Sequence, residues 1–270
     1  MITASNSRGW RIIHLLIAVC VFSIPAQAKY GGGNGTADDP YLIYTAEQMN
    51  TIGTEPNDWE KHFKLMADID LSKYKDTDFN MIGYASGWWG SSENKHPFTG
   101  VFDGNGKTIS NFNYNSSIGK SYIGIFSYIQ GATLKNIYLV DPNINTEGGE
   151  YVGSLVGFSR GTITTCYIQG GTISGSSEVG GLVGNNAGRI TKCASSATVL
   201  GSAAIGGIAG YNQNAIIGDC YSFGYVSGTR TVGGLVGFSG SHASIAYCYS
   251  AGKVHGTDNV GGLLGHSNSN

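Results

Sequence analysis

Short apolar clusters alternate with small and polar residues along most of this chain, and from Tyr151 onward they recur at a fixed interval. The clearest cluster reads Val-Gly-Gly-Leu-Val-Gly or a variant, and its copies begin at Val152, Val179, Ile205, Val232 and Val260. These starting points are 27, 26, 27 and 28 residues apart. A period in this range predicts a repeat architecture in which each unit packs against its neighbours.

The second half of each unit keeps the same register. Isoleucines recur at Ile163, Ile190, Ile217 and Ile245, and a cysteine follows each by three residues, at Cys166, Cys193, Cys220 and Cys248. Short β-branched runs separated by Gly, Asn and Ser are typical of strands and turns. We expect three short strands per unit, with glycine at the corners because it enters left-handed backbone conformations without a steric penalty.

These features predict an all-β fold, a single-stranded parallel β-helix with about 27 residues per coil. Successive coils would hydrogen-bond at a spacing of about 4.8 Å. Equivalent residues would then stack, so that the four isoleucines and the four cysteines form interior structural columns. A propeller is the alternative, but its blades need about 40 residues or more.

The recurring cluster, followed after about nine residues by Cys-Tyr-Ser or a variant, resembles the GLUG repeat of secreted bacterial surface proteins. The motif core begins at Gly181, Gly207, Gly234 and Gly262, with a variant at Ser154. The second part is well matched at Cys220 and Cys248 and partly matched at Cys166 and Cys193. The resemblance covers roughly residues 122–270 and implies an adhesin-like protein. Such repeats also accompany IgA-specific metallopeptidases.

The N-terminal half is organised differently. Residues 1–28 have the pattern of a secretory signal, with Arg8 and Arg11 before an apolar run and an Ala-Gln-Ala site ending at Ala28. An uncleaved anchor is the alternative. Residues 29–95 are predicted to cap the solenoid; there Thr45 and Gln48 form a capping box that opens a helix through Ile52.

Residues 96–150 are expected to form degenerate coils before the repeats of 151–270. The order of motifs from Tyr41 to Ile109 resembles the lead-in to secreted bacterial right-handed β-helix proteins. That resemblance implies a right-handed helix.

The charge and the cysteine content limit which classes of partner and ligand are expected. Only 13% of residues are charged and the net charge is −2, which argues against nucleic acid or an anionic membrane as the main partner. The repeat cysteines could pair as disulfides in an oxidising compartment or pack as a column of free thiols. We favour the thiol column. Thiols strung along an axis cannot surround one ion, so no metal and no cofactor are expected.

No His-Glu-x-x-His zinc motif occurs in the sequence. Asp68, Asp70 and Asp103 are the remaining catalytic candidates, since paired carboxylates serve as acid and base in carbohydrate-active β-helix enzymes. The alternative is that Asp68 and Asp70 end a strand and Asp103 caps a turn.

Aromatic residues are the candidates for ligand binding. Trp88 and Trp89 lie in a loop of small residues, where they would either stack on sugars or pack the cap against the first coil. Tyr167, Tyr221 and Tyr249 follow cysteines, so strand alternation should point them outward. Such a row would form a contact surface or only shield a sheet face.

The sequence therefore favours an exported, non-catalytic surface protein that binds a glycan or protein ligand. Two alternatives stay open: a polysaccharide lyase or hydrolase, and the front part of a larger adhesin or peptidase. The last coil would expose an unpaired edge, through which the chain could self-associate. No membrane span is expected once the signal is removed, and the mature protein would be secreted, periplasmic or on the cell surface.

Overall fold

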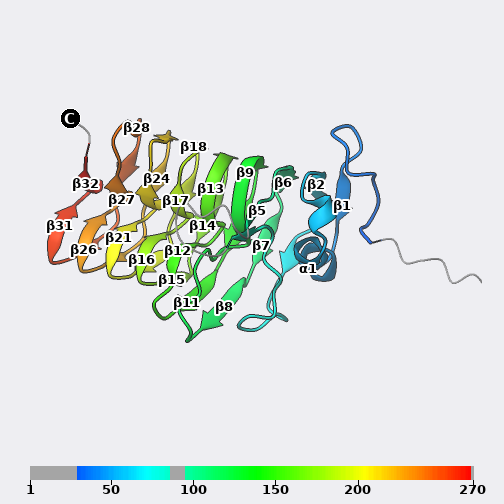
Figure 1. Cartoon of the computed structure of the whole chain (residues 1–270), viewed down its shortest axis with the longest axis horizontal. Helices are drawn as coiled ribbons and strands as arrows, with labels where there is room; N and C mark the ends of the chain where they lie inside the picture. Colours follow the sequence, from blue (N-terminus) through cyan, green and yellow to red (C-terminus); the bar gives the residue numbers. More distant parts are fainter. Residues whose placement is uncertain (1–28, 86–94, 269–270) are drawn as a thin grey trace, which may run out of the picture.

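The computed structural model describes residues 29–85 and 95–268, which form a β-solenoid whose coils stack along one axis (Figure 1). The described residues make about six turns of about 28 residues each. Strands of successive coils pair in parallel, and an antiparallel pair, β4 (Tyr84–Ala85) with β5 (Lys95–His96), projects from the side. The expected parallel β-helix is confirmed.

Four parallel sheets run along the axis within the described residues. The longest contains β1 (Tyr41–Ile43), β2 (His62–Leu65), β6 (Val101–Asp103), β9 (Phe126–Lys135), β13 (Val156–Thr164), β17 (Val183–Asn186), β22 (Ala209–Asn212), β27 (Val236–Ser239) and β32 (Leu264–Ser267), with β18 (Arg189–Thr191), β23 (Ile216–Gly218) and β28 (Ser244–Ala246) as a branch. The second contains β3 (Ile69–Asp70), β7 (Thr108–Ser110), β10 (Tyr138–Val140), β14 (Tyr167–Gln169), β19 (Ala194–Ser195), β24 (Tyr221–Ser222) and β29 (Tyr249–Ser250).

The other two sheets complete each coil. One contains β8 (Asn113–Ser116), β11 (Asn143–Thr146), β15 (Thr172–Ser174), β20 (Thr198–Leu200), β25 (Val226–Ser227) and β30 (Val254–His255). The other contains β12 (Glu150–Gly153), β16 (Ser177–Gly180), β21 (Ala203–Gly206), β26 (Arg230–Gly233) and β31 (Asp258–Gly261). A complete repeat coil, such as β16 to β20, therefore has five short strands, and the expected three was wrong.

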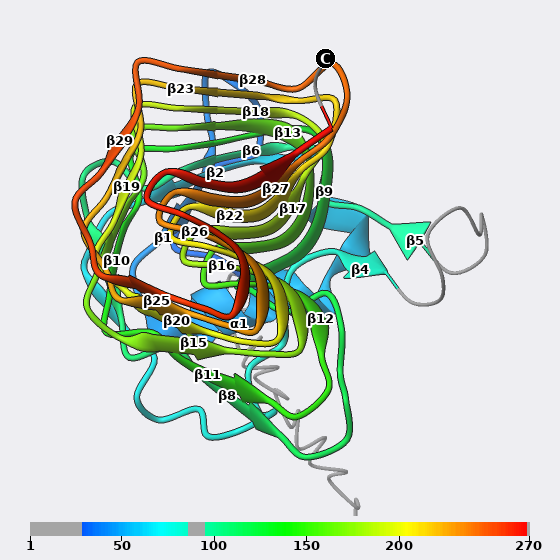
Figure 2. The ribbon, with the colours of Figure 1, turned by 90° about the vertical axis from the view of Figure 1, so that its left-hand side faces the viewer.

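The extra strands arise because the glycine motif folds back on itself. The motif enters on β16 and leaves on β17, and in the view down the axis this bend points into the coil (Figure 2). The last glycine of each motif meets the backbone of the preceding coil, where an added Cβ would lie within 3.0 Å of main-chain atoms. Gly184 faces Tyr151 and Val152 in this way, and Gly210 faces Glu178 and Val179.

The glycines thus permit close backbone packing, and the expectation that they serve as left-handed corners was wrong for the motif. None of the motif glycines has a positive φ. Two other positions in each repeat coil have a positive φ, and non-glycine residues occupy both. They are the residue before the motif (Tyr151, Glu178, Ala204, Thr231 and Asn259) and the residue before the cysteine (Thr165, Lys192, Asp219 and Tyr247).

The core consists of columns of stacked side chains. Ile163, Ile190, Ile217 and Ile245 occupy matched positions of β13, β18, β23 and β28. The column continues toward the N-terminus through Leu134 and Phe102, which are fully buried. Large aromatic side chains, such as Phe63 and Phe126, fill the wider first turns.

The four repeat cysteines form a second interior column of free thiols. The backbone N–H of Cys166 donates to Cys193 Sγ at 3.4 Å, and that of Cys220 donates to Cys248 Sγ at 3.4 Å. Burial raises the pKa of the Cys193 thiol well above its usual value. The hydrogen bond with Cys193 is the main cause that raises the pKa of Cys220 to about 12. Little thiolate therefore forms at neutral pH.

Helix α1 (Ala46–Thr54) covers the N-terminal end of the solenoid. The Thr45 hydroxyl accepts from Gln48 N, as in the first half of a capping box, while Gln48 Oε1 accepts from Tyr44 N, one residue before the N-cap. The helix buries Met49 and Ile52.

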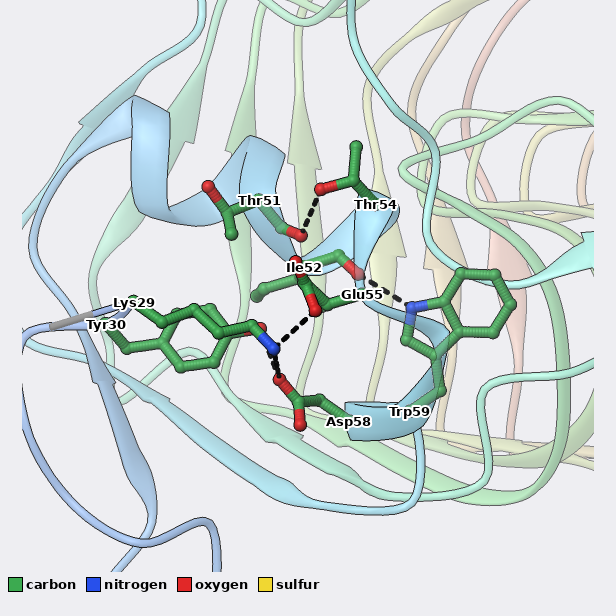
Figure 3. A network of polar contacts seen from close by, with 8 residues as sticks. All are labelled: Lys29, Tyr30, Thr51, Ile52, Thr54, Glu55, Asp58 and Trp59. Atoms are coloured by element: carbon green, nitrogen blue, oxygen red, sulfur yellow. Dashed lines mark hydrogen bonds and ion pairs between the residues drawn. The ribbon is translucent and has the colours of Figure 1, made fainter. Parts of the chain in front are cut away.

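A short 3-10 helix, η1 (Pro56–Asp58), follows α1 and is held by the contacts drawn in Figure 3. Lys29 forms ion pairs with Glu55 at 2.5 Å and Asp58 at 2.6 Å, and the Trp59 indole donates to Ile52 O at 2.7 Å. These contacts fix the segment that covers the first coil.

Candidate functional site

A column of tyrosines lies on the outer face of the second sheet. Strands β10, β14, β19, β24 and β29 align Tyr138, Tyr167, Ala194, Tyr221 and Tyr249 at one position. Because side chains alternate along a strand, the next residue in each strand points inward, as Leu139 and Ile168 do. We call these aligned residues the outer tyrosine column.

The column consists of two stacked pairs separated by Ala194. The rings of Tyr138 and Tyr167 are 5.1 Å apart at 24°, and those of Tyr221 and Tyr249 are 5.3 Å apart at 11°. Phe223 widens the second pair, with ring centroids 5.3 Å from Tyr221 and 5.8 Å from Tyr249. Tyr249 and Phe223 are about half exposed, at 51% and 49%. This face therefore offers aromatic rings and phenolic hydroxyls to solvent.

Among the predicted carboxylates, Asp70 and Asp103 each hold a turn, and Asp68 binds the first residue of β7 in the next coil. Asp68 accepts from Thr108 N at 2.9 Å, and Asp70 accepts from Ser72 N at 2.9 Å and Asn111 Nδ2 at 2.8 Å.

Asp103 accepts from Asn105 N at 2.8 Å and Asn136 Nδ2 at 3.0 Å. Hydrogen bonds, chiefly from Thr108 and Asn111 respectively, lower the pKa of Asp68 and of Asp70. Burial raises the pKa of Asp103, but its hydrogen bonds and Lys135 outweigh that effect and lower it. All three side chains are thus structural hydrogen-bond acceptors, two of them in turns, and their lowered pKa values do not suit a general acid at neutral pH.

The remaining predicted site residues, Trp88 and Trp89, lie outside the described residues.

A polar hollow on the third sheet was not anticipated from the sequence. It has a volume of about 390 Å³ and lies where β8, β11 and β15 present their outward residues. Its lining includes Asn113, Asn115, Asn143, Asn145 and Thr172. The Asn-x-Asn spacing in β8 and β11 is the sequence feature that indicates this hollow, since residues two apart share one face of a strand.

A second unanticipated feature is Glu178, which lies at the mouth of the glycine bend. Asn185 Nδ2, from the opposite side of the bend, donates to Glu178 Oε2 at 2.6 Å. Burial raises the pKa of Glu178 to about 7; the bond from Asn185 opposes this shift, and the nearby Glu150 adds to it. An alignment of the repeats reveals Glu178, because other copies have no acid at this position.

Comparison with known proteins places these features in context. The family described as the GLUG motif matches residues 175–200, the coil that contains Glu178 and Asn185. A solved structure of a "putative immunoglobulin A1 protease" from Bacteroides ovatus has a TM-score of 0.62 over 87% of each chain. Its sequence identity is 21%, so the likeness concerns the fold.

Two curated relatives match about half of the chain. A "Putative Gly-rich membrane protein" of Evansella cellulosilytica is 36% identical over 145 residues, and "Halomucin" of Haloquadratum walsbyi is 35% identical over 144 residues. The matches span 53% and 52% of this chain but only 16% and 1% of the relatives' own lengths. Within residues 29–85 and 95–268, no helix is long and apolar enough to cross a membrane. The chain is thus a repeat protein that carries the GLUG motif on a parallel β-helix.

Proposed function

We propose that this chain is an exported, non-catalytic module of a surface repeat protein, and that it binds a glycan through the outer tyrosine column. The names of the relatives, the GLUG motif and the signal-like residues 1–28 support a surface location. The hydrogen bonds that Asp68, Asp70 and Asp103 accept from neighbouring coils support a role without catalysis.

The break at Ala194 is the observation that carries the proposal. Tyr167 and Tyr221 lie two coil steps apart, about 9.6 Å at the usual strand spacing. Between them the column has only a methyl group, so the ring faces that point toward each other lack a third ring. Carbon atoms pack at about 3.5–4.0 Å, so two such contacts match the thickness of a puckered sugar ring, which would displace the side chains that now leave Ala194 only 7% exposed. The phenolic hydroxyls would bind its hydroxyl groups.

Binding to a glycan array tests this proposal. Tyr221→Ala should weaken binding of any glycan that the array identifies by about tenfold, the effect of losing about 1.4 kcal/mol. Ala194→Tyr, by contrast, should abolish binding, because it completes the column with the residue found in neighbouring coils.

Tyr44→Ala is the matched control, since Tyr44 is an exposed tyrosine on the cap, away from the column. The proposal fails if Ala194→Tyr binds as well as the unmodified protein. Turnover of a polysaccharide by the purified chain would contradict the non-catalytic role.

A further inference from the structure

Glu178 and Asn185 interrupt two rows of side chains that face each other across the glycine bend. In the coil before, these positions hold Tyr151 and Phe158, whose rings are 6.0 Å apart in an edge-to-face contact. In the coil after, they hold Ala204 and Tyr211. The acid–amide pair is therefore flanked by aromatic side chains on both sides along the axis.

The pair presents hydrogen-bond acceptors without matching donors. Asn185 is 2% exposed and uses Nδ2 to bind Glu178, while its Oδ1 has no hydrogen-bond partner among the described residues. A buried carbonyl oxygen without a donor costs free energy, so such an atom marks a place where a ligand gains by donating. An ionised Glu178 carboxylate is likewise an acceptor only.

The local charge is negative. Glu150 of the preceding coil lies close enough to raise the pKa of Glu178. Neither glutamate belongs to an ion pair found in the described part of the chain. Tyr122, Tyr151 and Tyr211 also lie near Glu178, whose charge adds to the burial that raises the pKa of each of these phenols. A ligand that fits must bring positive charge and hydrogen-bond donors.

We propose that Glu178 and Asn185 bind the primary ammonium group of an unacetylated amino sugar. The ammonium would donate to the Glu178 carboxylate and to Asn185 Oδ1, and the sugar ring would pack against Tyr211 beside the small Ala204. Aromatic rings also attract cations directly. Calcium and magnesium fit poorly, since each takes about six or more oxygen ligands, and no group of three or more metal-binding side chains lies within 29–85 and 95–268.

This site is separate from the outer tyrosine column. Only one part of the proposal, that the ammonium group belongs to a saccharide, rests on the proposed function. Calorimetric titration at neutral pH with glucosamine oligomers tests it, with N-acetylglucosamine oligomers of equal length as the reference ligand. The glucosamine oligomers should bind and the acetylated ones should not. Glu178→Gln should weaken binding by at least about tenfold, because it removes a charge-assisted hydrogen bond.

Glu147→Gln is the charge-matched control, because Glu147 is an exposed acid on a nearby turn; it should leave the affinity unchanged. Carbon-13 NMR of the Glu178 carboxyl gives a second readout in the unmodified protein, where glucosamine oligomers should lower the pKa of Glu178. This readout does not involve the outer tyrosine column, so a failure of the proposed glycan site would not affect it.

Three results would overturn the proposal: equal loss in the two glutamate variants, equal binding of the acetylated oligomers, or an unchanged pKa of Glu178. Binding of a lysine-containing peptide in place of glucosamine oligomers would also overturn it, since the ammonium group would then belong to a protein and not to a sugar.

Discussion

At the scale of single residues, the repeat imposes backbone geometry but leaves the side chain free to vary. The residue before each motif has a positive φ in every repeat coil, although Tyr151, Glu178, Ala204, Thr231 and Asn259 share no side-chain chemistry. Left-handed geometry costs a non-glycine residue about 1 kcal/mol or more. Its recurrence indicates that coil stacking overrides this cost. A single coil can therefore carry an acid at this corner without a change of fold.

The acid at this corner predicts a pH-dependent stability. The pKa of Glu178 is raised from 4.5 to about 7 in the folded chain. The folded state then holds a proton that the unfolded state has lost between these values, so stability falls as pH rises from about 4.5 to about 7. The shift corresponds to about 3 kcal/mol at most.

Urea unfolding of the unmodified protein and of Glu178→Gln at several pH values measures this effect. The difference in unfolding free energy between the two proteins should change by about 2–3 kcal/mol in favour of the variant between pH 4 and pH 8. A difference that stays constant with pH would show that the carboxyl is not perturbed.

At the scale of the elements, the glycine motif produces a re-entrant bend. Its second glycine packs against a serine of the same coil: Gly207 lies against Ser222, and Gly234 lies against Ser250. A carbonyl of the next coil closes the other side, as Gly234 O does for Gly207. At Gly207 and Gly234 the serine and the carbonyl leave little room for a Cβ, whereas the first copy has Ser154 at this position, whose buried hydroxyl donates to Gly181 O.

Gly207→Ala should destabilise the protein by about 1–3 kcal/mol, the usual effect of overpacking. The added methyl group would collide with the Ser222 side chain and with Gly234 O. Gly262→Ala is the matched control: it is the same motif position in the last coil, where nothing lies within 4 Å of an added Cβ. Thermal unfolding of both variants compares them, and equal melting temperatures would contradict the packing role.

Some elements of the structure could be predicted from the sequence and others could not. The interval of about 27 residues identified equivalent positions, so the isoleucine column and the outward Tyr167, Tyr221 and Tyr249 could be predicted. Periodicity carries no information on the path of the chain within one coil. The bend and its extra strands could therefore not be predicted from the sequence. The repeat pattern does not predict Glu178, because no other copy has an acid at this position, and its departure from the repeat is what distinguishes it.

At the scale of the whole molecule, each coil is a rung and each repeated position is a column along the axis (Figure 2). Interior columns of isoleucine and cysteine stabilise the stack, and outer columns display side chains at regular steps. In such a solenoid, contacts form between nearest neighbours. A change in one coil, such as Ala at position 194 or Glu at 178, therefore alters one step of an otherwise regular surface, which is where we propose that ligands bind.

Methyl NMR of the isoleucine column tests this stacking most directly. With labelled isoleucine methyl groups, Ile190 should show strong nuclear Overhauser effects to both Ile163 and Ile217, because each lies one coil step away, about 4.8 Å along the axis. Ile163 and Ile217, two steps apart, should show a much weaker effect. Absence of the effects from Ile190 to both neighbours, or an equally strong effect between Ile163 and Ile217, would contradict the stacked-coil account.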